Sequence, residues 1–152
     1  MNVTFSQNKI QNFEEFVDDY DNGGQQKIAY SKTDIAFSPN VIAGNTFTFE
    51  PVKNLKFSFI SKYVGEQYLD NTSTNTRKLD AFFVNDLRIN YSFKTKFIRS
   101  IGITVAVNNL FNEQYESNGY TWGYIYGGQR IVENFYYPQA GVNYLAGLTF
   151  KF

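Results

Sequence analysis

The chain has 152 residues, a length that suits a single domain. It contains neither Cys nor His, and this excludes disulfide bonds, thiolate metal sites and imidazole catalysis. Lys and Arg together number 14, as do Asp and Glu, so no basic field points to a nucleic acid partner.

Six long strands are predicted by runs in which apolar and polar residues alternate, because successive side chains of a strand point to opposite faces. In chain order the predicted strands are Val3–Phe16, Thr33–Glu50, Leu55–Tyr68, Leu79–Phe93, Ile101–Phe111 and Val142–Phe152. The segments expected to form long polar loops are 17–32, 69–79 and 113–141, and those expected to form short turns are 51–54 and 94–100. No segment has the period of a helix. The sequence therefore predicts an all-β fold in which six strands form an antiparallel meander.

Each strand is predicted to have one apolar and one polar face. The pattern is clearest in the fourth strand, whose apolar series comprises Ala81, Phe83, Leu87, Ile89, Tyr91 and Phe93. Its opposite face carries Asp86, Arg88, Asn90 and Ser92. The last strand repeats the pattern with Val142, Tyr144, Ala146, Leu148, Phe150 and Phe152. We therefore expect the apolar faces to contact hydrocarbon and the polar faces to line a hydrated interior.

Aromatic residues make up 19% of the chain, with 16 Phe and 12 Tyr, although the mean hydropathy is negative. This combination is typical of membrane β-barrels, in which lipid-facing and water-facing residues alternate between aromatic girdles. No apolar run approaches the ~20 residues of a membrane-spanning helix. Short turns of such barrels are periplasmic and long loops extracellular, which predicts a periplasmic position for Phe152. Residues 1–5 lack the features of a secretory signal, so we expect the chain to be part of a longer protein.

Two late segments resemble the end of the barrel of TonB-dependent receptors. The first is Val105–Tyr115, with the sequence V-A-V-N-N-L-F-N-E-Q-Y, which is similar to the penultimate strand of that family. The second is Tyr136–Gly141 followed by the closing strand Val142–Phe152. Phe37–Asn40 and Lys62–Asn71 also look like late strands of the family, so the resemblance covers nearly the whole chain.

The resemblance implies that residues 1–152 are the C-terminal part of a 22-stranded outer-membrane barrel in a Gram-negative bacterium. Family members have an N-terminal plug domain and a short box that contacts the energy-transducing protein TonB, and neither is present here. They import scarce ligands such as iron chelates, cobalamin or glycans. The implied partners are outer-membrane lipid, the rest of the barrel with its plug, TonB through the missing N-terminal part, and the outer-membrane assembly machinery. The residues implied to form the assembly signal are Tyr144, Leu148, Phe150 and Phe152.

The loop 113–141 is rich in Tyr and Gly and contains the single Trp. Tyr and Trp offer large amphipathic contact surfaces, and Gly allows their presentation. One interpretation is ligand capture at the extracellular mouth, with Tyr120, Trp122, Tyr124, Tyr126 and Arg130 as candidate contacts. The other is an aromatic girdle with loop self-packing, because Tyr and Trp favour membrane interfaces.

Other polar groups have equally ordinary alternatives. Asp18, Asp19, Asp21 and Asn22 suggest a weak divalent-cation site or a solvated acidic loop, and an EF-hand counted from Asp19 would have Tyr30 at its Glu position. Charged and amide side chains are also expected on the hydrated face, and they are Lys56, Lys62, Asp86, Arg88 and Asn90. One interpretation is that they line a transport path or contact a plug, and the other is that they form cross-strand pairs. No catalytic constellation, metal site or cofactor motif is recognised, so we expect no enzyme activity.

Two rival interpretations remain open. A complete small outer-membrane barrel with a structural or adhesive role would need eight strands, and the only room for two more is in segments 17–32 and 113–141. A soluble β-barrel or sandwich that binds a small apolar ligand would turn its apolar faces inward.

Overall fold

The computed structural model describes the whole chain, residues 1–152, and its regular structure consists of strands only. The prediction of an all-β fold is confirmed. The strands are β1 (Asn2–Phe5), β2 (Lys9–Asp19), β3 (Gln25–Asp34), β4 (Val41–Val52), β5 (Leu55–Val64), β6 (Gln67–Tyr68), β7 (Lys78–Leu79), β8 (Phe82–Phe93), β9 (Ser100–Asn108), β10 (Glu116–Tyr126), β11 (Gln129–Pro138) and β12 (Asn143–Lys151). No helix long and apolar enough to cross a membrane is present.

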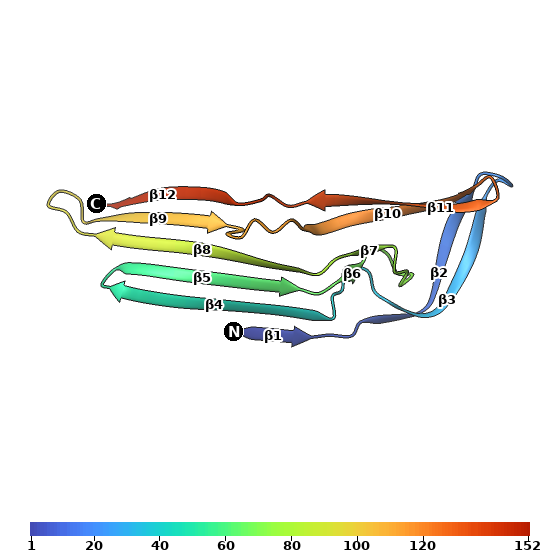
Figure 1. The fold of residues 1–152 in the computed structure, drawn as a ribbon, viewed down its shortest axis with the longest axis horizontal. Coiled ribbons are helices and arrows are strands. Elements are labelled where there is room, and N and C mark those ends of the chain that lie inside the picture. Colours follow the sequence, from blue (N-terminus) through green and yellow to red (C-terminus); the bar gives the residue numbers. More distant parts are fainter.

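The main body is a six-stranded sheet in the order β1-β4-β5-β8-β9-β12, in which all neighbours are antiparallel. Each of the six predicted strands contributes one strand to this sheet, so the predicted meander is confirmed. In Figure 1 the connection between β4 and β5, the connection between β8 and β9, and the C-terminus lie at one end of the sheet, which we call the turn end. The opposite end carries the longer connections, and we call it the hairpin end.

The boundaries of the first four predicted strands are wrong. Leu55–Tyr68 is divided between β5 and β6, and Leu79 belongs to β7 and not to β8. The first two predicted strands differ most from the structure. Val3–Phe16 is divided between β1 and β2, and Thr33–Glu50 is divided between β3 and β4, and the parts belong to different sheets. Pro39 lacks an N–H group and cannot continue a strand ladder, and its carbonyl instead accepts a hydrogen bond of 2.8 Å from Ser6 Oγ. The chain therefore leaves the main sheet after β1 and re-enters it at β4.

The prediction of loops at 17–32 and 113–141 is also wrong, because these segments take part in two β-hairpins. The hairpins β2–β3 and β10–β11 join into a second sheet with the order β11-β10-β2-β3, in which β10 and β2 are parallel. Each hairpin turn contains a Gly-Gly pair with positive φ, Gly23–Gly24 and Gly127–Gly128. Glycine adopts this conformation without steric cost, which permits tight hairpin turns. Figure 1 shows both hairpins beyond the hairpin end, near the short strands β6 and β7.

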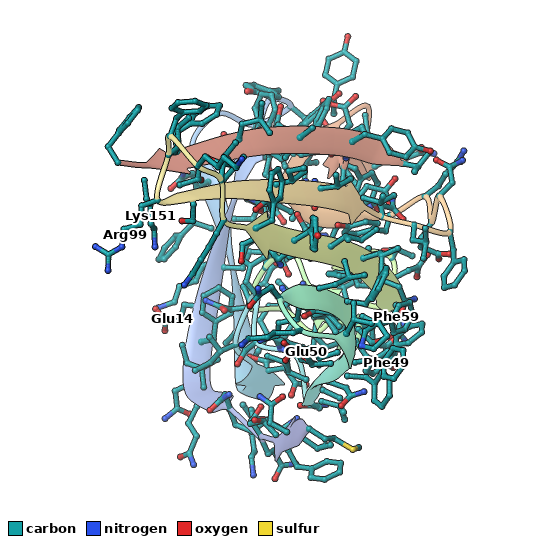
Figure 2. The ribbon with its side chains drawn as sticks, turned by 90° about the vertical axis from the view of Figure 1, so that its left-hand side faces the viewer. Glu14, Phe49, Glu50, Phe59, Arg99 and Lys151 are labelled. Carbon is teal, nitrogen blue, oxygen red and sulfur yellow. The ribbon has the colours of Figure 1, made fainter.

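The register separates the six-stranded sheet into an apolar and a polar face, as predicted. Residues paired across strands point to the same face. One apolar row consists of Phe49, Phe57, Ile89, Val105 and Ala146, and the next of Phe47, Phe59, Leu87, Val107 and Tyr144. Between these rows, the opposite face carries Thr48, Ser58, Arg88, Ala106 and Leu145. Figure 2, a view along the strands, shows Phe49 and Phe59 on one side of the sheet and Glu50 and Lys151 on the other.

No second layer covers the apolar face of the six-stranded sheet. Phe47, Tyr144 and Leu148 are 63%, 70% and 64% exposed, whereas side chains of this size are normally buried in a soluble domain. Phe83 is also exposed, so Phe83 and Leu148 do not belong to an interior core. Most buried apolar residues lie at the hairpin end instead, and they are Val17, Val64, Leu69, Leu79 and Phe82. Val64 and Phe82 are the residues of β5 and β8 at this end of the main sheet, and Ala106 is buried on β9.

Candidate functional site

Four of the predicted ligand contacts lie together on one face of the β10–β11 hairpin. Tyr120, Trp122, Tyr124 and Tyr126 alternate along β10, and alternate residues of a strand share a face. Tyr120 stacks on Phe135 of β11 with ring centroids 4.8 Å apart, and the Trp122 and Tyr124 rings are 5.6 Å apart. Trp122 is half-exposed, as are Tyr120 and Tyr126. The structure thus brings the predicted aromatic residues into one continuous, accessible stripe.

Arg130, the fifth predicted contact, lies on the other face of the hairpin. It pairs with Ile125 in the register, and Ile125 alternates with the aromatic residues of β10. The Arg130 guanidinium Nη2 donates a hydrogen bond to Glu15 Oε1 of β2. The charge of Arg130 is therefore engaged in an ion pair and does not belong to the aromatic stripe.

Glu15 is the centre of a partly buried ionic cluster that joins three segments of the chain. It also accepts hydrogen bonds from Arg77 Nη1 at 2.8 Å and from the Tyr30 hydroxyl at 2.8 Å. Arg77 Nη1 donates in addition to Asp70 at 2.6 Å, and the Arg77 side chain is only 3% exposed. Burial alone would raise the pKa of Glu15, but the hydrogen bonds from Arg77, Arg130 and Tyr30 lower it below its ordinary value. The carboxylate therefore stays ionised and holds both hairpins against the segment 65–81.

The face of β10 opposite the aromatic stripe can approach the segment 65–81 because two residues on this face are glycines, which lack a side chain. A Cβ added to Gly119 would lie 2.6 Å from the Phe135 carbonyl oxygen and 3.1 Å from Leu69 Cδ2. A Cβ added to Gly123 would lie 3.2 Å from Arg77 Nη2. Glycine at these two positions thus allows the hairpin to pack over Leu69 and Arg77, which leaves the aromatic stripe on its free face.

The acidic residues near Asp19 hold the tips of the two hairpins together. Asp19 Oδ1 accepts hydrogen bonds from the backbone N–H groups of Asp21 and Asn22. The two carboxylate oxygens of Asp21 accept from the N–H groups of Gly127 and Gly128 at 2.9 and 2.8 Å. The hydrogen bonds from Asn22 and then Gln26 lower the pKa of Asp19. These carboxylates are turn-forming groups, and no set of three or more potential metal ligands lies together in the chain.

The Asn-Asn-Leu-Phe-Asn segment, 108–112, ties the end of β9 to the start of β12. The buried Asn109 Nδ2 donates to the carbonyl oxygens of Glu113 and Ala140, and its Oδ1 accepts from the Glu113 N–H. Asn112 Oδ1 accepts from the N–H of Val142 at 3.0 Å. Both Asn residues have positive φ, a conformation that Asn tolerates better than most residues. The motif thereby supplies the two tight backbone positions and the side-chain acceptors that this connection requires.

The predicted assembly-signal residues lie on β12 and directly after it. Tyr144, Leu148 and Phe150 share the apolar face of the six-stranded sheet, and Phe152 follows the last strand residue. All four are exposed. β12 is bonded to β9 alone, so its outer edge carries unpaired backbone groups. This edge is available to a further strand.

The ionic cluster is the main feature that the sequence analysis did not identify. Glu15 lies in a predicted strand, and Arg77 and Arg130 lie in predicted polar loops, where Arg130 is predicted to contact a ligand and not to form an ion pair. The only signal in the sequence is that Arg77 lies in a polar segment that also contains Leu69 and Leu79. Comparison of the chain with protein families, curated proteins and solved structures finds no match.

Proposed function

We propose that this chain forms the C-terminal part of the membrane-embedded barrel of a TonB-dependent outer-membrane receptor. Its role there is to form part of the barrel wall, the closing seam and part of the extracellular mouth. The ligand, an iron chelate, cobalamin or a glycan, binds outside, and TonB then drives the opening of a plug in the N-terminal part. The chain itself carries no catalytic step.

The observation that carries this proposal is the exposed apolar face opposite a polar face of the same sheet. In water, the exposure of Phe47, Tyr144 and Leu148 on one continuous face would favour aggregation. Against lipid the same face is stable, because its side chains leave water while the polar face remains hydrated in the barrel interior.

The apolar face also has a suitable extent. Phe93 and Phe83 on β8 lie ten residues apart, about 33 Å along the strand, and a tilt of about 40° reduces this to about 25 Å across the membrane.

The edges of the sheet support the same proposal. The outer edge of β12 is unpaired, and β1 covers only the Val41–Gly44 portion of β4, so Asn45–Val52 also carries a free edge. Unpaired strand edges are not tolerated in a bilayer, because backbone N–H and C=O groups find no partner in hydrocarbon. Further strands at both edges would satisfy them. A small complete barrel would need two more strands in this sheet, and the only room for them is in residues 17–32 and 113–141. The strands of these two segments belong instead to the separate sheet at the hairpin end.

The absence of Cys from the chain makes a direct test of the faces possible. In the full-length protein, single Cys variants at Val105 and Leu148 on the apolar face and at Thr104 and Lys56 on the polar face are labelled with a fluorophore. The protein is then inserted into vesicles that contain brominated lipid, a contact quencher in the hydrocarbon region. We expect quenching at Val105 and Leu148 and little at Thr104 and Lys56. Equal quenching on both faces, or none at all, would contradict the proposal.

A further inference from the structure

A cavity of about 290 Å³ lies on the polar face of the six-stranded sheet, near the hairpin end. It is lined by Lys62, Val84, Asp86, Asn108, Asn109, Tyr115, Gln139, Ala140 and Asn143. These residues come from β5, β8, β9, β12 and the connections that flank β10 and β11. Its volume is close to the lower limit of small-molecule sites, and the convergence of several strands on it is typical of such sites.

Several polar groups at this cavity have unused hydrogen-bonding capacity. The side chains of Lys62 and Gln139 make no hydrogen bond within the chain, although the Gln139 backbone N–H donates to the Tyr115 carbonyl oxygen at 3.0 Å. Asp86 uses Oδ1 to accept from the Asn109 N–H at 2.9 Å, and its Oδ2 remains free. Asn108 donates to Asn143 at 2.8 Å, which orients both carboxamides at the cavity wall. The site therefore offers free donors and free acceptors side by side.

The aromatic residue at the cavity is held in a defined position. The Tyr115 ring stacks on Phe82 with a centroid distance of 4.3 Å and an interplanar angle of 27°. Burial, and then the nearby Asp86 carboxylate, raises the pKa of Tyr115, so its hydroxyl group stays neutral and can donate a hydrogen bond. A ring beside hydrogen-bonding groups gives the cavity both an apolar and a polar contact surface.

We propose that this cavity binds one sugar unit of a neutral, polyhydroxylated ligand. Sugar hydroxyl groups both donate and accept hydrogen bonds, and carboxamide side chains can do the same. The one cation and one anion of the wall, Lys62 and Asp86, balance each other, whereas recognition of an anionic iron chelate requires an excess of positive charge. The aromatic stripe of β10 also lacks a cation, because Arg130 pairs with Glu15 on the opposite face. The inference rests on the proposed function, which gives a ligand access to the polar face.

The test measures binding by the full-length protein in a zwitterionic detergent, because alkyl glycoside detergents would compete as sugars. The probes are maltotriose, cellotriose and chitotriose as neutral glycans and ferric citrate as an anionic chelate, with binding measured by calorimetry. We expect at least one glycan to bind and Gln139→Leu to raise its Kd about two- to tenfold for each hydrogen bond lost. Gln11→Leu is the matched control, because Gln11 is exposed on β2 and makes no side-chain hydrogen bond. Lys62→Gln removes the positive charge and keeps a hydrogen-bond donor, so we expect it to lower glycan affinity less than Gln139→Leu does.

Three results would overturn the inference: no glycan binds, Gln139→Leu and Gln11→Leu have the same affinity, or ferric citrate binds in a manner that Lys62→Gln abolishes. The lipid-quenching experiment separates this failure from failure of the proposed function. Quenching at Val105 without glycan binding would contradict the sugar site alone. Absence of quenching at Val105 would contradict the membrane-embedded barrel, on which the sugar site depends.

Discussion

Substitution of Val105 by Arg is the most direct energetic test of the sheet's two faces. Val105 lies on the apolar face between its register partners Ile89 and Ala146. Along β8, Ile89 is four residues from Phe93 and six residues from Phe83, so this row lies near the middle of the apolar band. We therefore expect the new guanidinium of Val105→Arg to be forced into the region of the hydrocarbon core where its transfer costs most.

The expected cost follows from the depth of the site. An Arg at the bilayer midplane destabilises a barrel by about 2–4 kcal/mol, which is about 30- to 900-fold in the equilibrium constant, and near the interface the cost falls to about 0–1 kcal/mol. The neighbouring Thr104 lies on the polar face and donates a hydrogen bond of 3.0 Å to Asn90 Oδ1. Thr104→Arg loses this exposed hydrogen bond, and its charge remains hydrated, so we expect a cost of about 1 kcal/mol or less.

The assay compares the urea dependence of folding for the full-length protein and the two variants in lipid vesicles, with the same lipid and pH throughout. The difference between the two variants is the quantity of interest, because it cancels the cost that any new Arg imposes on β9. A difference of at least about 1 kcal/mol in the expected direction supports the face assignment. Equal costs at the two positions, or a larger cost at Thr104, would refute it.

Three further predictions concern the hairpin end and the closing strand. Because the folded-state pKa of Glu15 is lowered, its contribution to stability is complete above about pH 4.5, the ordinary pKa of Glu, and is lost as the pH falls through the lowered value. Amide hydrogen exchange should therefore accelerate in β2 and β10 at a higher pH than in the six-stranded sheet. Simultaneous acceleration in both sheets would contradict this prediction. Asn109→Ala removes three side-chain hydrogen bonds and should cost about 1–3 kcal/mol in urea unfolding, whereas the exposed Asn75→Ala should cost little. Phe152→Ala should lower the amount of full-length protein in the outer-membrane fraction, and unchanged abundance on immunoblots would argue against a sorting role.

The two-faced main sheet was predictable because strand periodicity is a local property. Phe57 and Phe59 alternate with Lys56 and Ser58 in the sequence itself, and no tertiary contact is needed to recognise the pattern. A short connection near Pro51–Asn54 was also visible in composition, although in the structure β4 continues through Pro51 to Val52 and only Lys53 and Asn54 connect it to β5. The alternation of aromatic residues from Tyr120 to Tyr126 was also present, although it lay in a segment rich in Gly and was interpreted as a loop.

The sequence by itself determined the all-β class, the six strands of the meander and the residues on each of its faces. These features follow from the alternation of side chains along a strand, which is visible in any short stretch of the chain. Only the tertiary structure decided that β2–β3 and β10–β11 form a second sheet, since the parallel pairing of Tyr124 with Asp18 joins distant segments and leaves no local signature. It likewise decided that Arg130 faces Glu15 and not the aromatic stripe. Ion pairs and cavities depend on which distant residues the register brings together, and that information is absent from any single stretch of the chain.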